Sequence, residues 1–228
     1  DAEVKRVSEA ATNPIRKLPY STPAYTVNDG VTLLETPEGP MPIEVFGAHN
    51  LNNLAGAKWI CQNMGVDEAD FYEAIASFKG ASKRLEKIAE GKGRVAYKDF
   101  AHSPSKVAAT TKAVKEQYPN RTLVACLELH TYSSLNAEFL KEYEGALEYA
   151  DEAVVFYSPD AVKIKQLEEV TYEQIAKAFN REDLIIYTNP AEFKQYLFNR
   201  NLDNSALLLM SSGNYGGLNF DEVKQLIE

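Results

Sequence analysis

From Arg84 onward, short apolar runs alternate with segments of helical periodicity, and this alternation constrains the fold more than any other feature of the chain. Two of the runs, Leu123–Leu127 and Ala206–Met210, are apolar at every position. Strands that are buried on both faces of a parallel sheet have this composition. Strands and helices that alternate at this spacing predict right-handed βαβ units in a doubly wound sheet.

Six strands and five helices are predicted in this part of the chain. The strands are Lys87–Ala89, Val95–Phe100, Leu123–Leu127, Ala153–Tyr157, Leu184–Tyr187 and Ala206–Met210. The helices are Ser105–Gln117, Ala137–Tyr149, Tyr172–Phe179, Ala191–Phe198 and Phe220–Ile227. The predicted fold is therefore α/β, with a Rossmann-like, mostly parallel six-stranded sheet.

The segment before Arg84 has a different organisation. It is predicted to contain a short helix at Asp1–Ala11, extended chain over Leu18–Glu35, a turn at Thr36–Pro42, a strand at Ile43–Phe46, and helices at Gly47–Gly65 and Asp67–Phe78. The β-meander up to Phe46 is too small to form its own core, so we expect it to pack against a later segment or against a part that this chain lacks. A small, polar stretch at Lys79–Lys83 predicts a domain boundary, which divides the chain into residues 1–83 and 84–228.

Composition excludes several classes of partner. The chain of 228 residues carries 24 basic and 33 acidic side chains, a net charge of −9, which argues against a nucleic-acid partner. No apolar run approaches ~18 residues and no signal-peptide pattern is present, so we expect a cytoplasmic protein without a membrane partner. Cys61 and Cys126 lie in apolar surroundings, which predicts buried thiols. The chain begins at Asp1 within helical sequence, which suggests a fragment of a longer protein.

Polar residues end the predicted strand Val95–Phe100. Asp99 and His102 come just before Ser103 and Pro104, which are suited to start a helix. Open α/β sheets bind ligands at the carboxyl edge of their strands. A carboxylate at this edge can hold ribose hydroxyls, although Asp99 could equally be an ordinary strand-end turn residue.

Two further loops follow predicted strands. Glu128–Ser134 combines an acid, a histidine and hydroxyls, which suits a polar substrate, although an ordinary β–α loop has the same composition. Met210–Gly217 carries three glycines that would let backbone amides approach a ligand. No strand is followed by G-x-G-x-x-G, which disfavours a nicotinamide-binding oxidoreductase.

The start of the predicted helix Gly47–Gly65 offers groups that suit a nucleotide. Asn50 and Asn53 are three residues apart, so they share a helix face, and their carboxamides can meet the edge of an adenine ring. His49 could stack on the base. Alternatively, Asn50 caps the helix. Arg84 lies in the interdomain segment, where it could hold a phosphate or form an interdomain salt bridge.

Taken in order, three motifs resemble the Mur ligase family, the ATP-dependent ligases that build the bacterial cell-wall precursor. The motifs are G-x-H-N-x-x-N at Gly47, His49, Asn50 and Asn53, then F-x-G-x-x-x-R at Phe78, Gly80 and Arg84, then D-[FY]-[AG]-H-x-P at Asp99–Pro104. A fourth segment, Met210–Gly217, is similar to the murein peptide ligase subgroup, which joins UDP-N-acetylmuramate to a recycled tripeptide. The alternative is the subgroup that adds L-alanine. The resemblance covers nearly the whole chain.

The resemblance implies a role for each group of residues. ATP, used with magnesium, would contact His49, Asn50, Asn53, Arg84 and Asp99. The incoming amine substrate would face His102, Glu128, His130, Ser133, Ser212, Gly213 and Asn214. Residues 1–83 would be the end of the central ATP-binding domain, and residues 84–228 the complete C-terminal domain. No catalytic residue is predicted within this chain.

The chain also departs from the family. The phosphate loop G-x-x-x-x-G-K-[ST] and the family's magnesium-binding glutamate are both absent from the sequence, and in the family they lie upstream. We therefore expect the fragment alone to be inactive. Ser103 stands where relatives often have a second histidine, and the loop at His130–Ser134 lacks the arginines of related ligases, which leaves the peptide substrate open. A non-catalytic nucleotide-binding module is the alternative function.

Overall fold

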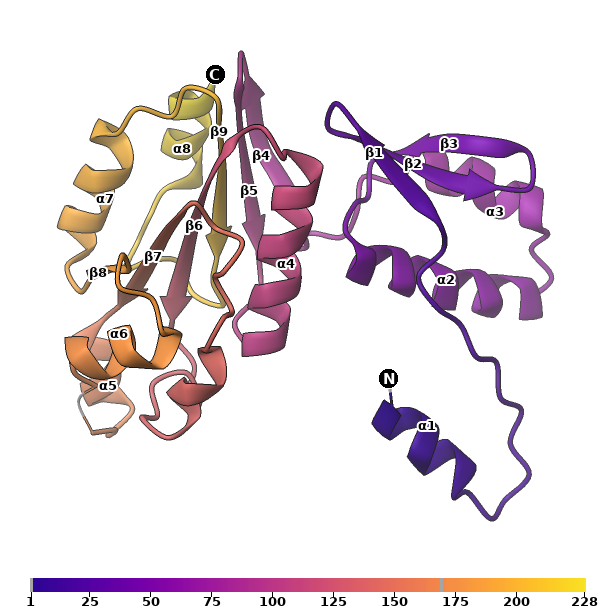
Figure 1. Cartoon of the computed structure of the whole chain (residues 1–228), viewed down its shortest axis with the longest axis horizontal. Helices are drawn as coiled ribbons and strands as arrows, with labels where there is room; N and C mark the ends of the chain where they lie inside the picture. The colour runs from indigo at the N-terminus through magenta and orange to yellow at the C-terminus, as the bar shows by residue number, and fades with distance from the viewer. Residues whose placement is uncertain (1, 169) are drawn as a thin grey trace.

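The computed structural model describes residues 2–168 and 170–228, and its larger unit is built on one six-stranded sheet (Figure 1). The strands are β4 (Glu86–Gly91), β5 (Arg94–Asp99), β6 (Thr122–Leu129), β7 (Glu152–Tyr157), β8 (Ile185–Tyr187) and β9 (Ser205–Met210). Their order is β4-β5-β9-β6-β7-β8. The edge strand β4 is antiparallel to β5, and every other neighbouring pair is parallel. The prediction of a mostly parallel six-stranded sheet is confirmed.

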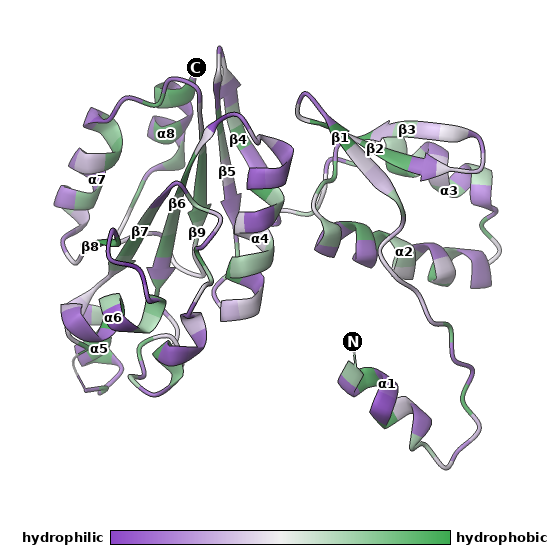
Figure 2. Ribbon diagram, in the orientation of Figure 1, coloured by the Kyte–Doolittle hydropathy of each residue, from purple (hydrophilic) through white to green (hydrophobic). Residues whose placement is uncertain are grey.

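Helices cover both faces of this sheet. One face packs against α4 (Pro104–Gln117), the 3₁₀ helix η1 (Phe139–Tyr143) and α6 (Tyr172–Phe179), and the other against α7 (Pro190–Asn199) and α8 (Phe220–Ile227). Successive strand residues alternate between the two cores: Val95 and Tyr97 belong to the first and Ala96 to the second. Hydrophobic residues therefore occupy most positions of the central strands (Figure 2).

The smaller unit is a three-stranded antiparallel meander packed on two helices. Its elements are β1 (Tyr25–Asn28), β2 (Val31–Thr36), β3 (Gly39–Ile43), α2 (Ala48–Asn63) and α3 (Glu68–Ala76). They enclose a cluster of five buried residues, Leu34, Ile43, Leu51, Leu54 and Phe71. The meander therefore packs on the helices that follow it, as expected from its size, and the meander and helices together form a small core. The helix α1 (Ala2–Glu9) lies apart from it and has no buried residue (Figure 1); Asp1 falls outside the described residues.

The smaller unit packs against the C-terminal end of α4. Thr32 Oγ1 donates a hydrogen bond to Gln117 Oε1 at 2.9 Å, and Gln117 Nε2 donates to the Gly30 carbonyl. Phe46 meets Tyr97 edge-on, with ring centroids 5.2 Å apart. One buried amide side chain thus joins the β1–β2 hairpin to the larger unit.

The strand predicted at Ile43–Phe46 is wrong, because the turn before it is shorter than expected. Residues 37 and 38 make the turn, and β3 runs from Gly39 to Ile43. Pro40 and Pro42 lie within β3. Proline is tolerated there because β3 is an edge strand, where a missing N–H leaves no ladder bond broken.

The helix predicted at Ala137–Tyr149 is also wrong. After η1 the chain makes successive turns with i to i+3 hydrogen bonds, such as Ala146 N to Tyr143 O and Ala150 N to Leu147 O. Gly145 has φ +71°, which a regular helix does not allow. Apolar residues three apart point inward in these turns as they would in an α-helix, so the sequence pattern did not separate the two structures.

Other differences are smaller. The helix α5 (Pro159–Ile164), capped by Ser158, was not predicted. Cys126 is buried as predicted, but Cys61 is only half-buried, and both thiols are free. Within residues 2–168 and 170–228, no helix has the length and apolar character needed to cross a membrane.

Candidate functional site

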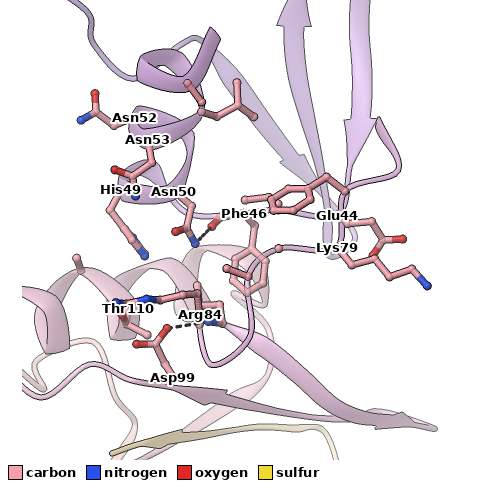
Figure 3. Close-up of a pocket in the computed structure, with 18 of the residues that line it drawn as sticks. Glu44, Phe46, His49, Asn50, Asn52, Asn53, Lys79, Arg84, Asp99 and Thr110 are labelled. Carbon is pink, nitrogen blue, oxygen red and sulfur yellow. Dashed lines mark hydrogen bonds between the residues drawn. The ribbon is translucent and has the colours of Figure 1, made fainter. Parts of the chain in front are cut away.

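A cleft of about 680 Å³ lies where the two units meet (Figure 3). Its walls come from the start of α2, the linker that leads into β4, the end of β5 and the first half of α4. The predicted nucleotide residues His49, Asn50, Asn53, Arg84 and Asp99 all line it. Residues from three separate motifs therefore meet in one cavity of the size that holds small-molecule ligands.

The α2 side of the cleft depends on Gly47, the residue that precedes the helix. Gly47 has φ +88°, and a Cβ atom there would lie 2.6 Å from the Ala113 Cβ atom of α4. Asn50 does not cap the helix as the alternative proposed. Its Nδ2 atom instead donates to the Phe46 carbonyl at 3.0 Å (Figure 3). Asn53 and His49 make no hydrogen bond to described residues, which leaves their polar atoms available to a ligand.

The linker side is held by Asp99. Its Oδ2 accepts the Leu85 amide at 2.7 Å, and its Oδ1 accepts the Ala101 amide at 2.6 Å. Lys83 and Leu85 have φ of 55° and 44°, a left-handed conformation that side chains rarely adopt. The buried carboxylate thus fixes a strained linker. Each oxygen keeps a lone pair for a further donor.

Arg84 lies between these two strained residues and is exposed. Its guanidinium carbon lies 5.7 Å from the centroid of the Phe100 ring. Among residues 2–168 and 170–228 it forms no ion pair, so the predicted alternative of an interdomain salt bridge is not observed.

Burial sets the charge states around the cleft. It lowers the pKa of the His49 imidazole, and Arg84 lowers it further while Asp99 opposes the change. Burial raises the pKa of the Asp99 carboxyl, although the amides of Leu85 and Ala101 oppose the rise. His49 is therefore biased toward the neutral form, which suits contact with an uncharged ring.

A second cluster of predicted residues lies at the ends of β6 and β9. Buried Glu128 accepts hydrogen bonds from the Ser211 hydroxyl and from the Tyr215 amide, the latter at 2.8 Å. His130 Nδ1 lies 3.6 Å from Glu128 Oε1. A Cβ atom at Gly213 would lie 2.8 Å from Glu128 Oε2, so the loop closes tightly over the acid. Ser212 Oγ is buried there without a partner among the described residues.

The remaining amine-side residues are dispersed along this edge. Ser133 Oγ bonds Thr131 Oγ1 at 3.1 Å, and the Asn214 side chain accepts the Gly217 amide at 3.2 Å. His102 Nδ1 lies 2.8 Å from the Phe100 carbonyl, and His102 does not line the cleft. The two clusters share one sheet edge, because the Ser211 amide donates to the Asp99 carbonyl at 2.9 Å.

The sequence interpretation missed several cleft residues. Glu44, Lys79, Lys106 and Thr110 also line the cavity. Lys106 and Thr110 could have been found, because they lie four residues apart on the helix that starts beside Asp99. Glu44 and Lys79 could not, because only the folded junction brings them near. These two residues, with Phe46 and Leu85, also border a second cleft of about 750 Å³ on the far side of the junction.

Described residues provide no metal site. Within residues 2–168 and 170–228, no group of three or more His, Cys, Asp or Glu side chains could hold a metal ion.

The doubly wound sheet, with a cleft at the carboxyl edge of its strands, places the chain among the α/β proteins, a class that binds ligands at this edge. Residues 83–213 match the family described as Mur ligase, glutamate ligase domain. The chain therefore belongs to the Mur ligase family.

Relatives and solved structures agree with this assignment. The UDP-N-acetylmuramate–L-alanine ligase of Lactococcus lactis is 27% identical over 65% of this chain and 33% of its own length. The UDP-N-acetylmuramate–alanine ligase structure of Thermotoga maritima superposes with a TM-score of 0.66 at 18% identity, covering 93% of this chain and 46% of that one. The murein peptide ligase structure of Psychrobacter arcticus gives 0.58 at 19% identity, covering 87% and 42%. This chain thus spans about a third of the Lactococcus relative and less than half of each structure.

Proposed function

We propose that this chain forms part of an ATP-dependent ligase that joins UDP-N-acetylmuramate to a murein peptide, with L-alanine as the alternative amine substrate. The observation that carries the proposal is the cleft, in which His49, Asn50, Arg84 and Asp99 line one cavity. Membership of the Mur ligase family supports the reaction class. The similarity to both an L-alanine ligase and a murein peptide ligase supports either amine.

In this proposal the adenosine half of ATP occupies the cleft. Asn50 and Asn53 border the adenine, neutral His49 lies beside it, and Asp99 accepts ribose hydroxyls with its remaining lone pairs. Arg84 binds phosphate. The complete reaction would transfer the γ-phosphate of ATP to the carboxylate of UDP-N-acetylmuramate. The amine then attacks the acyl phosphate through a tetrahedral intermediate and phosphate leaves.

The amine substrate would meet the cluster around Glu128. Glu128 on β6 already accepts two hydrogen bonds from the β9–α8 loop, so its first role is to shape that loop. His130, with its side chain 40% exposed, is the ionisable group of this cluster that can reach a substrate, whereas Glu128 is buried. We therefore propose that His130 determines which amine substrate binds and that it does not contact the nucleotide.

The test is a ligase assay on the product of the complete gene, with ATP, UDP-N-acetylmuramate, and either L-alanine or L-alanyl-γ-D-glutamyl-meso-diaminopimelate. We expect ADP release that depends on the tripeptide. Release with L-alanine alone would support the alternative substrate. A complete gene without a phosphate loop would contradict the ligase proposal, and it would favour the non-catalytic nucleotide-binding module instead.

A further inference from the structure

The cleft has a positive local charge in a protein that is acidic as a whole. The chain carries a net charge of −9, yet the charged residues that line the cleft are Glu44, Lys79, Arg84, Asp99 and Lys106. Glu44 and Lys79 point to the far side of Phe46 (Figure 3). Asp99 has both oxygens bound to backbone amides. Arg84 and Lys106 are therefore the positive charges that a ligand in the cleft would meet, beside the Asp99 carboxylate.

Lys106 has no ion-pair partner among the described residues, unlike three other lysines of β5 and α4. Lys98 pairs with Glu86 at 2.9 Å, Lys112 with Glu116 at 3.7 Å and Lys115 with Asp151 at 2.8 Å. Lys106 forms no ion pair or side-chain hydrogen bond within residues 2–168 and 170–228. The first turn of α4 also contains no acidic residue. No carboxylate of the described chain therefore pairs directly with the Lys106 ammonium group.

The geometry of α4 directs Lys106 into the cleft. Lys106, Ala109 and Thr110 are spaced by three and four residues, so they lie on one helix face, and all three line the cavity. Arg84 approaches from the linker, a different element of the fold. Two unpaired cations from separate elements thus face one space, an arrangement suited to a ligand with several negative charges.

We propose that Lys106 binds the phosphate groups of the nucleotide together with Arg84, an inference that rests on the nucleotide function proposed above. The ammonium group is a compact charge with three donors on a flexible stem, so it can follow phosphate oxygens as the ligand settles. Its contribution increases with the number of phosphates and is absent for a nucleoside.

NMR chemical-shift titration of the protein of full gene length with ATP and with adenosine tests the inference, because it measures even millimolar dissociation constants. In Lys106→Gln we expect the ATP dissociation constant to rise about tenfold, the effect of one charge-assisted hydrogen bond. The adenosine constant should not change. Lys106→Arg, which keeps the charge, should retain most of the ATP affinity. Lys112→Gln is the matched control on the same helix and should leave both constants unchanged.

Two results would overturn the inference while nucleotide binding stands. One is an unchanged ATP dissociation constant in Lys106→Gln, and the other is an equal fold rise in the ATP and adenosine dissociation constants. Failure of the proposed function looks different: the unsubstituted protein of full gene length would bind neither ATP nor adenosine at millimolar concentration.

Discussion

At the scale of single residues, Asp99 shows how one side chain serves both the fold and the candidate site. Its two oxygens hold the amides of Leu85 and Ala101, and the first of these fixes the strained linker beside Arg84. Replacing Asp99 by alanine would remove these bonds and any ribose contact together. Its effect on nucleotide affinity would therefore combine two causes, which makes Asp99 a poor probe of binding alone.

His49 gives a residue-scale prediction about pH. Its folded pKa lies below the ordinary value of 6.5, so the unfolded chain takes up the proton first as the pH falls. The stability that His49 contributes is complete above about pH 6.5 and is lost as the pH falls toward the folded pKa. In His49→Gln we expect the free energy of unfolding to depend less on pH in this window. Urea denaturation across a pH series measures the free energy of unfolding at each pH.

Asp99 provides an internal contrast for that experiment. Its raised pKa gives the opposite slope, in which stability decreases as the pH rises through the more acidic range above the unfolded value of 3.8. The difference in free energy of unfolding between the unsubstituted protein and His49→Gln should therefore appear below pH 6.5, and its slope should have the sign given for His49. If this difference does not change with pH in that range, the lowered pKa of His49 is contradicted.

At the scale of elements, the β9–α8 loop depends on close contact between Gly213 and Glu128. Glu128 cannot retreat, because Ser211 and Tyr215 hold its carboxylate. A methyl group at Gly213 would approach the carboxylate oxygens to 2.8 Å and 3.1 Å. We expect Gly213→Ala to lower the free energy of unfolding by about 1–3 kcal/mol, the usual cost of overpacking. Chemical denaturation gives the value.

The double substitution Gly213→Ala with Glu128→Asp serves as the control. The shorter acid withdraws its oxygens from the new methyl group, so the two changes together should cost less than the sum of each alone. Strict additivity would mean that the contact with Glu128 is not the source of the effect.

At the scale of the whole molecule, the width of the cleft depends on how closely α2 approaches α4. A Cβ atom at Gly47 would lie 2.6 Å from the Ala113 Cβ and would force φ +88° on a residue with a side chain. We expect Gly47→Ala to lower the free energy of unfolding by about 2–4 kcal/mol and to weaken adenosine binding. Denaturation and NMR titration measure the two effects.

Ala113→Gly separates the two causes. Added to Gly47→Ala, it removes the overlapping atom but leaves the backbone strain, so part of the lost stability and most of the adenosine affinity should return. If neither returns, strain at residue 47 alone explains the effect, and the spacing between the units does not set the cleft.

The sequence by itself determined the larger unit. Apolar runs such as Ala206–Met210 are local features, and burial on both faces follows directly from them. It also indicated the nucleotide residues, because His49, Asn50, Arg84 and Asp99 each lie in a short motif, although their contacts with a ligand stay a prediction. It did not separate the turns after η1 from a helix, because both use a spacing of three.

Only the tertiary structure decided which polar residues share a cavity. The strand order places β9 between β5 and β6, so Asp99 and Glu128 lie on strands that are not neighbours. The His102 side chain contacts the Phe100 carbonyl and does not line the cleft. The packing of α2 against α4 brought Lys106 and Thr110 to the residues at the start of α2. These are contacts between segments far apart in the chain, and local sequence patterns carry no information about such distances.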